Sequence, residues 1–364
     1  MGHSNLLSFN MPPISKSGLL GVLSGAGGGG GLGLYQELAR TTLGSTSTTL
    51  DVSYDDKPYL MFLIDWARET GASADPLAQL GDTSADNGNN YSRRLSADGG
   101  SDSTNTSVNY FSKWATGSGS SVRNFEVMVL ANNADLEKPI IVQGNFSAST
   151  GSSSAPSRTE NVGKWANTSV QAGYFSYNGT AGTTFSTGSE VVVLGYDPAD
   201  TSGDSVWEEL ASVELTGSAS VIDSGTITAK KYLWVEAFTQ ATGGATGDGM
   251  RFQSDSGDNY SQRKSADGGS DSTATSTNRI AYDATGSSND KFTSAYIVNN
   301  ADEEKLVIGE LNQRNTSGSG SAPRRSEFVG KWANTSNSIT SVQIVNLDAG
   351  DFASGSILKV WGFD

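Results

Sequence analysis

Short apolar runs separated by polar turns recur along nearly the whole chain. Residues 48–52 and 231–238 alternate between apolar and polar positions, as a strand with one buried face does. Residues 59–66 (Tyr-Leu-Met-Phe-Leu-Ile-Asp-Trp) form a continuous apolar run, which favours a strand buried on both faces over the competing short helix. Further strands are predicted at residues 125–130, 139–142, 170–176, 190–194, 279–282, 292–298, 306–311, 339–345 and 357–361. No stretch predicts a long amphipathic helix, so the pattern indicates an all-β fold.

The chain contains one domain written twice. Residues 86–104 return almost unchanged at 255–273, and residues 160–169 return at 327–336. From Asn132 onward the two copies align without gaps, because the offset between Asn132 and its counterpart Asn299 stays constant to the end of the chain. A repeat of this length indicates a duplicated domain and not a solenoid, whose units are much shorter. Many short strands spaced by turns predict two tandem antiparallel β-sandwich domains of jelly-roll type. We place the first over residues 34–197, a linker over 198–205 and the second over 206–364.

A glycine-rich arm, residues 1–33, precedes the first domain. The uncharged run at 17–34 is about as long as a membrane span, but its glycines disfavour a helix and add little apolar area. A secretory signal fits poorly, because strong positive charge and a clear cleavage site are missing. A flexible linker is one interpretation. We prefer an anchor that binds another protein through its apolar side chains, which are Leu6, Leu7, Phe9, Met11, Leu19 and Leu20.

Composition narrows the possible functions. The 364 residues include 39 acidic and 24 basic side chains, which give a net charge of −15. This charge argues against nucleic acid and anionic membranes as partners. There is no cysteine, and His3 in the arm is the single histidine, so neither a Ser-His-Asp nor a Cys-His arrangement can form within a domain. We therefore expect no enzyme and no cofactor.

Carboxylates are the remaining source of chemistry. The matched Glu160 and Glu327 would suit a glycosidase if they lay across a sugar bond. The acids of the repeated turns offer hard oxygen ligands for calcium, although their spacing is not that of an EF-hand loop. These candidates are Asp98, Asp102, Asp267 and Asp271. We favour turn capping over both chemical roles, because Asp in such Ser/Gly-rich sequence commonly bonds its own backbone.

Several matched residues are assigned structural roles. The glycines that follow an Asp in the repeated stretch suit turns that need positive φ. The matched tryptophans predict one wide ring in each sandwich core, and an exposed platform for sugars is the alternative. If they are buried, sugars cannot stack on them. The motif residues are Tyr91, Gly99, Trp165, Tyr260, Gly268 and Trp332.

Three stretches carry a resemblance to a known family: Gly-Asp-Asn-Tyr-Ser at 257–261, Trp-Ala-Asn-Thr-Ser-Asn-Ser-Ile-Thr-Ser-Val-Gln-Ile at 332–344, and Phe-Ala-Ser-Gly-Ser-Ile-Leu-Lys-Val-Trp-Gly at 352–362. They resemble small virion proteins of tailed bacteriophages, which carry a similar G-D-x-G-x-N-Y turn, W-x-N-T-x-x-I-T-S-I strand and closing F-x-x-G-S strand. The first domain departs at 170–174, where Val-Gln-Ala-Gly-Tyr replaces the Ile-Thr-Ser-Val form. The resemblance covers both halves but not the arm.

The resemblance implies a structural protein of the virion and no catalytic residues. Our leading prediction is a capsid decoration or cement protein that binds viral capsid or other virion proteins as a homotrimer. Three chains of two like domains would give six similar lobes, which suit threefold or quasi-sixfold sites. The alternatives are a head or tail fibre or spike, a double jelly-roll major capsid protein and, from another class, a module that binds glycans of the host surface.

Overall fold

The computed structural model describes residues 35–70, 76–113, 122–147, 149–179, 182–200, 205–283, 286–316 and 318–364. Throughout these residues the regular structure is β-strand, paired in antiparallel sheets, and no helix that could span a membrane is found among them. The predicted all-β class is confirmed. The alternative of a short helix at 59–66 is wrong, because this run lies in strand β3 (Tyr59–Thr70). The predicted arm and residues 201–204 of the predicted linker lie outside the described residues.

The first domain is built from a large and a small antiparallel sheet. The large sheet has the strand order β1–β13–β3–β8–β9–β10–β5–β6, and the small sheet has the order β2–β11–β4–β7. The large-sheet strands are β1 (Gln36–Thr42), β13 (Glu190–Tyr196), β3, β8 (Arg123–Ala131), β9 (Lys138–Phe146), β10 (Ser157–Trp165), β5 (Tyr91–Ala97) and β6 (Ser103–Val108), and the short β12 (Thr184–Phe185) pairs with β3. The small sheet contains β2 (Thr49–Ser53), β11 (Tyr174–Asn178), β4 (Leu77–Gly81) and β7 (Ser112–Lys113).

The second domain repeats this strand order. Its large sheet runs β14–β27–β16–β22–β23–β24–β19–β20, and its small sheet runs β15–β25–β18–β21. The large-sheet strands are β14 (Glu208–Glu214), β27 (Ile357–Phe363), β16 (Tyr232–Thr239), β22 (Lys291–Val298), β23 (Lys305–Gln313), β24 (Arg324–Trp332), β19 (Tyr260–Ala266) and β20 (Ser272–Thr277). The others are β15 (Val221–Asp223), β25 (Val342–Asn346), β18 (Asp248–Phe252), β21 (Ile280–Ala281) and the pair β17 (Ala241–Thr242) and β26 (Asp351–Phe352).

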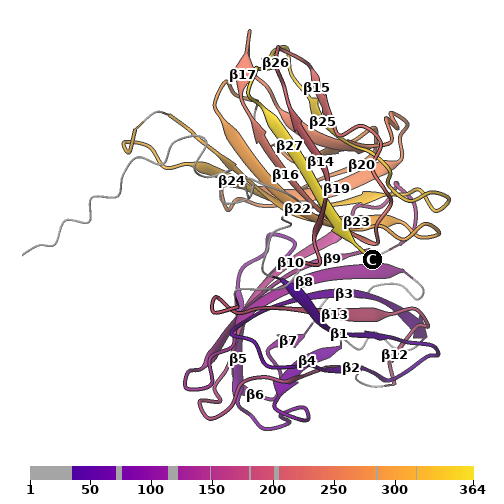
Figure 1. Cartoon of the computed structure of the whole chain (residues 1–364), viewed down its shortest axis with the longest axis vertical. Helices are drawn as coiled ribbons and strands as arrows, with labels where there is room; N and C mark the ends of the chain where they lie inside the picture. The colour runs from indigo at the N-terminus through magenta and orange to yellow at the C-terminus, as the bar shows by residue number, and fades with distance from the viewer. Residues whose placement is uncertain are drawn as a thin grey trace, which may run out of the picture.

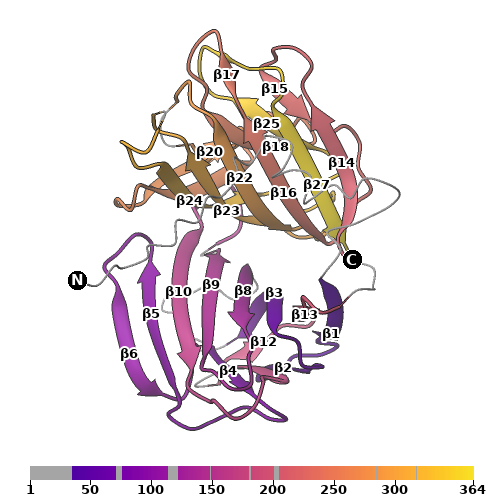
Figure 2. The same cartoon turned by 60° about the vertical axis from the view of Figure 1, so that its left-hand side comes forward.

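Each domain is a jelly roll with an extended large sheet. In the first domain, β1–β13–β3–β8 and β2–β11–β4–β7 are the two four-stranded sheets of the jelly-roll order. Strands β9, β10, β5 and β6 continue the large sheet beyond β8 and form a wing that Figure 2 shows below β23 and β24. The predicted duplication of a jelly-roll-like sandwich is therefore confirmed.

Two of the predicted strands begin later than the hydrophobic pattern indicated. The strand predicted at 170–176 begins at Tyr174, and the one predicted at 339–345 begins at Val342. The preceding backbone is held by a buried asparagine in each domain. Asn132 Oδ1 accepts the Ala172 backbone N–H at 2.7 Å, and Asn299 Oδ1 likewise accepts the Ile339 N–H. The apolar residues before these strands are therefore fixed by side-chain hydrogen bonds instead of ladder bonds.

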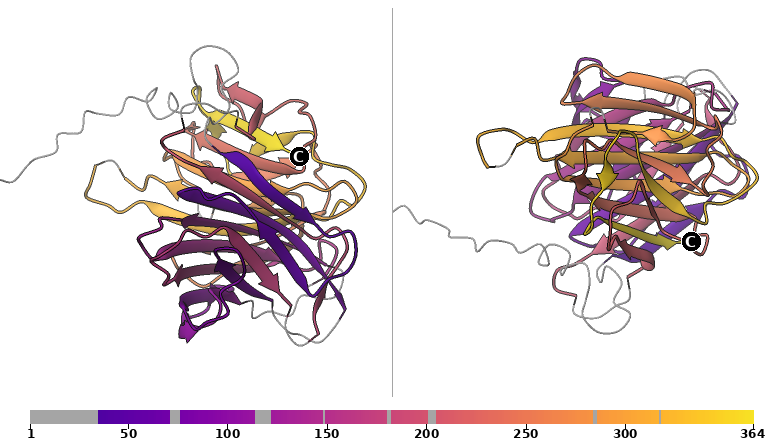
Figure 3. Two further views of the ribbon diagram at one scale, coloured as in Figure 1. Left: turned by 60° about the horizontal axis from the view of Figure 1, so that its bottom comes forward. Right: turned by 90° about the horizontal axis from the view of Figure 1, so that it is seen from above.

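The two large sheets face one another, so the molecule has four layers in the order small, large, large, small (Figure 1). Figure 3 shows the second domain lying over the first. Each sandwich has its own apolar core between its two sheets, and a third core lies between the two domains. Strand β3 shows why residues 59–66 are so apolar. Leu60, Phe62 and Ile64 enter the first core, and Met61 and Leu63 enter the third.

Candidate functional site between the two domains

The matched tryptophans lie inside the sandwiches. Trp165 and Trp332 are each 1% exposed, and each stacks on the tyrosine of the repeated stretch, Tyr91 or Tyr260. Each indole N–H donates to a turn carboxylate at 2.8 Å, Asp86 in the first domain and Asp255 in the second. The prediction of one wide ring per core is confirmed. Stacking of a sugar on either indole is excluded, because both rings are covered by protein.

The repeated glycines occupy the turns that the sequence predicted. Gly99 has φ +69° and Gly268 has φ +72°, and in each turn the preceding Asp also has positive φ, at +51°. The Gly100 N–H donates to Ala97 O at 2.8 Å and the Gly269 N–H to Ala266 O at 2.9 Å, so the two residues of positive φ form a type I′ turn within each connecting loop, and Asp-Gly is a preferred pair in such turns. Asp98 Oδ1 also accepts the Arg158 backbone N–H at 2.9 Å, and Asp267 Oδ1 accepts the Arg325 N–H at 3.0 Å. These two acids are therefore turn-stabilising groups.

The four acids considered for calcium do not converge on one point. Asp102 pairs with Arg94 at 3.2 Å at the surface of the first domain, and Asp267 pairs with Arg324 at 3.0 Å in the second. Asp98 and Asp271, in contrast, meet across the domain boundary through arginines, as described below. Among the described residues, no group of three or more His, Cys, Asp or Glu side chains is arranged to hold a metal ion. The six apolar residues of the arm lie outside the described residues.

The third core joins the domains over the middle of both large sheets. The first domain contributes Met61, Leu63, Phe125, Val127, Val192 and Leu194, and the second contributes Trp207, Tyr232, Val298, Leu306, Ile308, Val329, Trp361 and Phe363. Trp207, just before β14, packs edge-to-face on Phe363 with ring centroids 4.8 Å apart. Apolar burial of this kind is the main favourable term in association. The two jelly rolls are consequently one continuous body.

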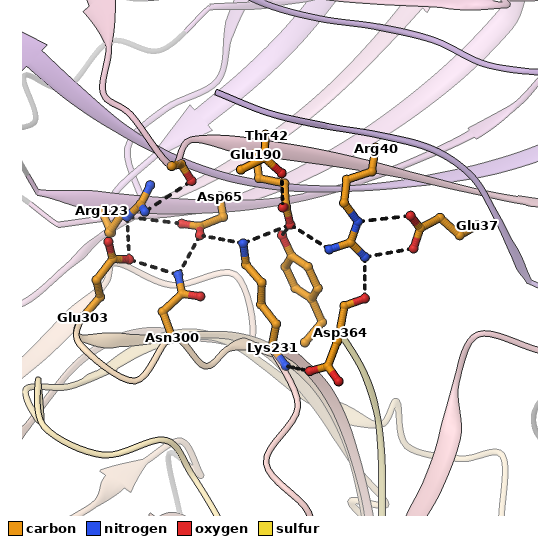
Figure 4. A network of polar contacts seen from close by, with 12 residues as sticks. Glu37, Arg40, Thr42, Asp65, Arg123, Glu190, Lys231, Asn300, Glu303 and Asp364 are labelled. Carbon is orange, nitrogen blue, oxygen red and sulfur yellow. Dashed lines mark hydrogen bonds and ion pairs between the residues drawn. The ribbon is translucent and has the colours of Figure 1, made fainter. Parts of the chain in front are cut away.

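Two buried carboxylates of the first domain lie beside this core (Figure 4). Glu190 accepts the Tyr232 hydroxyl at 2.9 Å and pairs with Lys231 at 3.0 Å, both from the second domain. Burial alone would raise the pKa of Glu190, but the hydrogen bond from Thr42 and the charge of Lys231 hold it below its ordinary value. Asp65 accepts the Asn300 side-chain amide at 2.8 Å and lies 3.8 Å from Arg123. Charge pairs therefore cross the boundary where the apolar contact ends.

A hairpin of the first domain makes further contacts with the second domain. We call residues 145–158, the tip that joins β9 to β10, the first hairpin; residue 148 is outside the described residues. The buried Asn145 amide donates to two backbone oxygens of the second domain, Val307 O at 2.9 Å and Gly330 O at 2.8 Å. The Gly151 N–H donates to Glu304, and Lys331 Nζ donates to Ser149 O at 2.7 Å.

The base of the first hairpin meets the second copy of the repeated turn. Arg158 Nη2 pairs with Asp271 at 2.7 Å, and the Arg263 Nε donates to Pro156 O at 2.8 Å. Arg263 also pairs with Asp98 at 3.2 Å. Two of the predicted calcium candidates, Asp98 and Asp271, are thus paired with arginines at the domain boundary.

A groove of about 320 Å³ opens where the wing of the first domain diverges from β23 and β24. The first domain supplies Arg94, Asp102, Ile141, Gln143, Glu160 and Val162 to its walls, and the second supplies Glu310, Arg325 and Glu327. The sequence-matched Glu160 and Glu327 are therefore brought into one groove. Burial raises the pKa of Glu160, partly offset by Arg158, and Glu327 raises it further. The pKa of Glu327 is also raised by burial, against the opposing charge of Arg325.

The groove offers ion pairing and apolar contact. Each of the two matched glutamates already has an arginine partner, Arg158 for Glu160 and Arg325 for Glu327. Ile141 and Val162 are cross-strand neighbours on the wing and are 53% and 50% exposed. A wall that combines exposed aliphatic groups with paired charges resembles the rim of a protein interface more than a reaction centre.

Sequence reasoning did not identify the first hairpin or the face that it covers. A signal was present, since residues 145–158 and 312–325 agree at Asn, Gly, Ser, Pro and Arg positions of a predicted loop. Agreement in a loop is harder to explain by packing than agreement in a core. The sequence alone could not show that only one of the two loops is covered.

Comparisons with known proteins add little. The sequence matches no protein-family model, and no relative was found among curated proteins. Among solved structures, domains LG4-5 of the mouse laminin alpha1 chain match over 89% of this chain and 89% of that one, with 10% identity and a TM-score of 0.20.

Proposed function

We propose that this chain is a structural protein of a virus particle, a decoration or cement protein that attaches to the outer shell and acts without catalysis. The observation that carries the proposal is the third core, which joins two jelly rolls face to face into one block. Such a block can bridge neighbouring shell subunits without bending between its domains, because the boundary is apolar and continuous. The resemblance to virion proteins of tailed bacteriophages is the reason for proposing that this block belongs to a virus particle.

The motif residues support a structural role. Tyr91, Trp165, Tyr260 and Trp332 lie in the cores, and Gly99 and Gly268 form turns. Tyr260 and Trp332, which lie in the stretches that carry the resemblance, therefore support the fold of the second half, and we assign them no role in a reaction. The proposed attachment is the arm at residues 1–33, whose apolar side chains would be buried against capsid or another virion protein as the chain assembles as a trimer.

A major capsid protein of double jelly-roll type is the second candidate, because both halves have the eight-strand jelly-roll order. Copy number separates the two candidates, since a major capsid protein would form the shell itself.

The test is to locate the chain on the particle. An antibody raised against the recombinant protein would be used for immunogold electron microscopy of virus particles from the source that encodes it, with quantitative mass spectrometry of the same particles. Surface label at a copy number below that of the main shell protein supports decoration. Absence of the chain from purified particles would refute a virion role. Recombinant protein with and without residues 1–33 would then be added to particles that lack it, and equal binding would refute anchoring by the arm.

A further inference from the structure

Among the strongly exposed large apolar side chains, all but Leu136 correspond through the repeat to a residue that the other domain buries. In the described residues, the strongly exposed large apolar side chains are Tyr59, Leu136, Ile141, Val162 and Phe292. The strand registers show which positions of the two domains are equivalent. The equivalent residues are Tyr59 and Tyr232, Ile141 and Ile308, Val162 and Val329, and Phe292 and Phe125. All four of these counterparts are buried in the third core. The two domains therefore bury different but overlapping parts of the equivalent sheet face against one another.

The face that the first hairpin covers also has an uncovered copy. On the second domain this docking face contains Glu304, Ile308, Val329 and Lys331, and Lys331 is fully buried beneath the first hairpin. On the first domain the counterparts are Glu137, Ile141, Val162 and Lys164. Lys164 pairs with Glu137 at 2.8 Å, as Lys331 does with Glu304 at 3.3 Å, but both partners of the first-domain pair are nearly half exposed. At these four positions the first-domain docking face keeps the residue types of the second-domain face, and all four side chains are exposed.

The hairpin has an undocked copy as well. The second hairpin, residues 312–325 with residue 317 outside the described part, repeats the contact-making residues of the first. These are Asn312, Gly318, Ser319, Pro323 and Arg325, in the places of Asn145, Gly151, Ser152, Pro156 and Arg158. Gly318 has φ +81° where Gly151 has +84°, so this glycine has the same left-handed backbone in both hairpins. Asn312 and Arg325 are exposed, and the hairpin at the end of β24 projects from the body in Figure 1.

We propose that the second hairpin and the Phe292 end of one copy of this chain dock on the first-domain docking face of a second copy, and so repeat between chains the contact that joins the two domains within a chain. The partner is a second copy because the chain itself carries both halves of an interface already formed once, and the uncovered face is continuous with that interface through the groove. Arg325 would meet Asp102 as Arg158 meets Asp271. A contact between unlike surfaces is heterologous and produces rings or open chains of copies. The inference is independent of the proposed role in a virus particle.

The test is the association state of the full chain, measured by sedimentation velocity across a concentration series. Ile141→Glu places a charge in the first-domain docking face, which we call the acceptor side of the contact. Phe292→Glu places a charge beside the second hairpin, on the surface proposed to dock there, which we call the donor side. Both side chains are exposed, so both variants should melt at the wild-type temperature, whereas the matched control Ile308→Glu, at a position 2% exposed, should melt lower. Each exposed variant alone should associate at least about tenfold more weakly than the wild type.

Mixing the two variants tests the polarity of the contact. The Ile141→Glu chain keeps an intact donor and the Phe292→Glu chain an intact acceptor, so the mixture should form a one-to-one complex that does not grow further. A wild-type chain that stays monomeric at its highest soluble concentration would overturn the proposal. Association that survives in both single variants, or a mixture that remains monomeric, would overturn it too.

Discussion

A carboxyl group in the middle of the first core should make stability depend on pH. Glu126, on β8, is 1% exposed, and its Oε1 accepts the Trp66 indole N–H at 2.7 Å and the Tyr177 hydroxyl at 2.8 Å. Burial raises its pKa to about 8, against the opposing effect of these two hydrogen bonds. The counterpart in the second domain is Thr293, which does not titrate. The carboxyl is consequently neutral in the folded protein at pH 7.

Stability should fall as pH rises, because the pKa of Glu126 is higher in the folded protein than in the unfolded chain. The folded state holds the Glu126 proton up to a pKa of about 8, while the unfolded chain releases it near the ordinary value of 4.5. Stability from this group is therefore fully present below about pH 4.5 and is lost as pH rises toward 8. At about 1.4 kcal/mol for each pKa unit, the loss between about pH 4.5 and pH 7 amounts to about 3 kcal/mol.

Glu126→Gln isolates this term, because the amide oxygen can accept the same two hydrogen bonds but does not titrate. The free energy of unfolding of both proteins would be measured by urea denaturation at several pH values. Other buried acids titrate in both proteins and cancel in the difference. The variant should gain about 3 kcal/mol relative to the wild type between about pH 4.5 and pH 7. A difference that stays constant with pH would refute the assignment of a protonated Glu126 in the core.

Three further predictions concern the turns, the boundary and the arm. Gly99→Ala and Gly268→Ala should each lower the free energy of unfolding by at least about 1 kcal/mol, because both glycines have positive φ. Gly99→Ala should lower the melting temperature more, because an added Cβ would lie 2.5 Å from Asp271 Oδ1, and equal decreases in melting temperature would contradict this. Asn145→Ala leaves two buried carbonyl oxygens without that donor and should cost about 2–3 kcal/mol in urea unfolding, and a change within error would argue against the docked hairpin. Removal of residues 1–33 should leave the melting temperature unchanged, and a large decrease would show that the arm supports the fold.

Much of the fold could be predicted from the sequence because two kinds of signal agree. Alternating and continuous apolar runs identify strands, and the repeat shows that the same strands occur twice. The run at 59–66 predicted burial on both faces, and the third core explains it, since Met61 and Leu63 face the other domain. The prediction failed at residues 170–172, where the Val170 and Ala172 N–H groups donate to the side chains of Asn167 and Asn132 and not to a neighbouring strand. Hydrophobic pattern carries no information about such a replacement.

The site was harder to predict for a physical reason. Ile141 and Val162 are identical in type to Ile308 and Val329, yet one pair is exposed and the other buried. Which pair is covered depends on how the two domains are placed relative to each other, and identical residues cannot distinguish the two outcomes. The roles of Gly99 and Trp165 were predictable because they depend on local backbone shape and on the core of one domain.

The third core also bears on whether the halves of this gene are separable modules. Domains that meet through a small polar boundary can often be cut apart and studied alone, whereas here a cut near residue 200 would leave an apolar sheet face, aromatic as well as aliphatic, on each piece. Fragments 1–200 and 205–364 produced separately are therefore each expected to aggregate, and produced together to reconstitute the folded molecule as a split protein. A duplication fixed in this way makes each copy a subunit for the other, held at high effective concentration by a short connection.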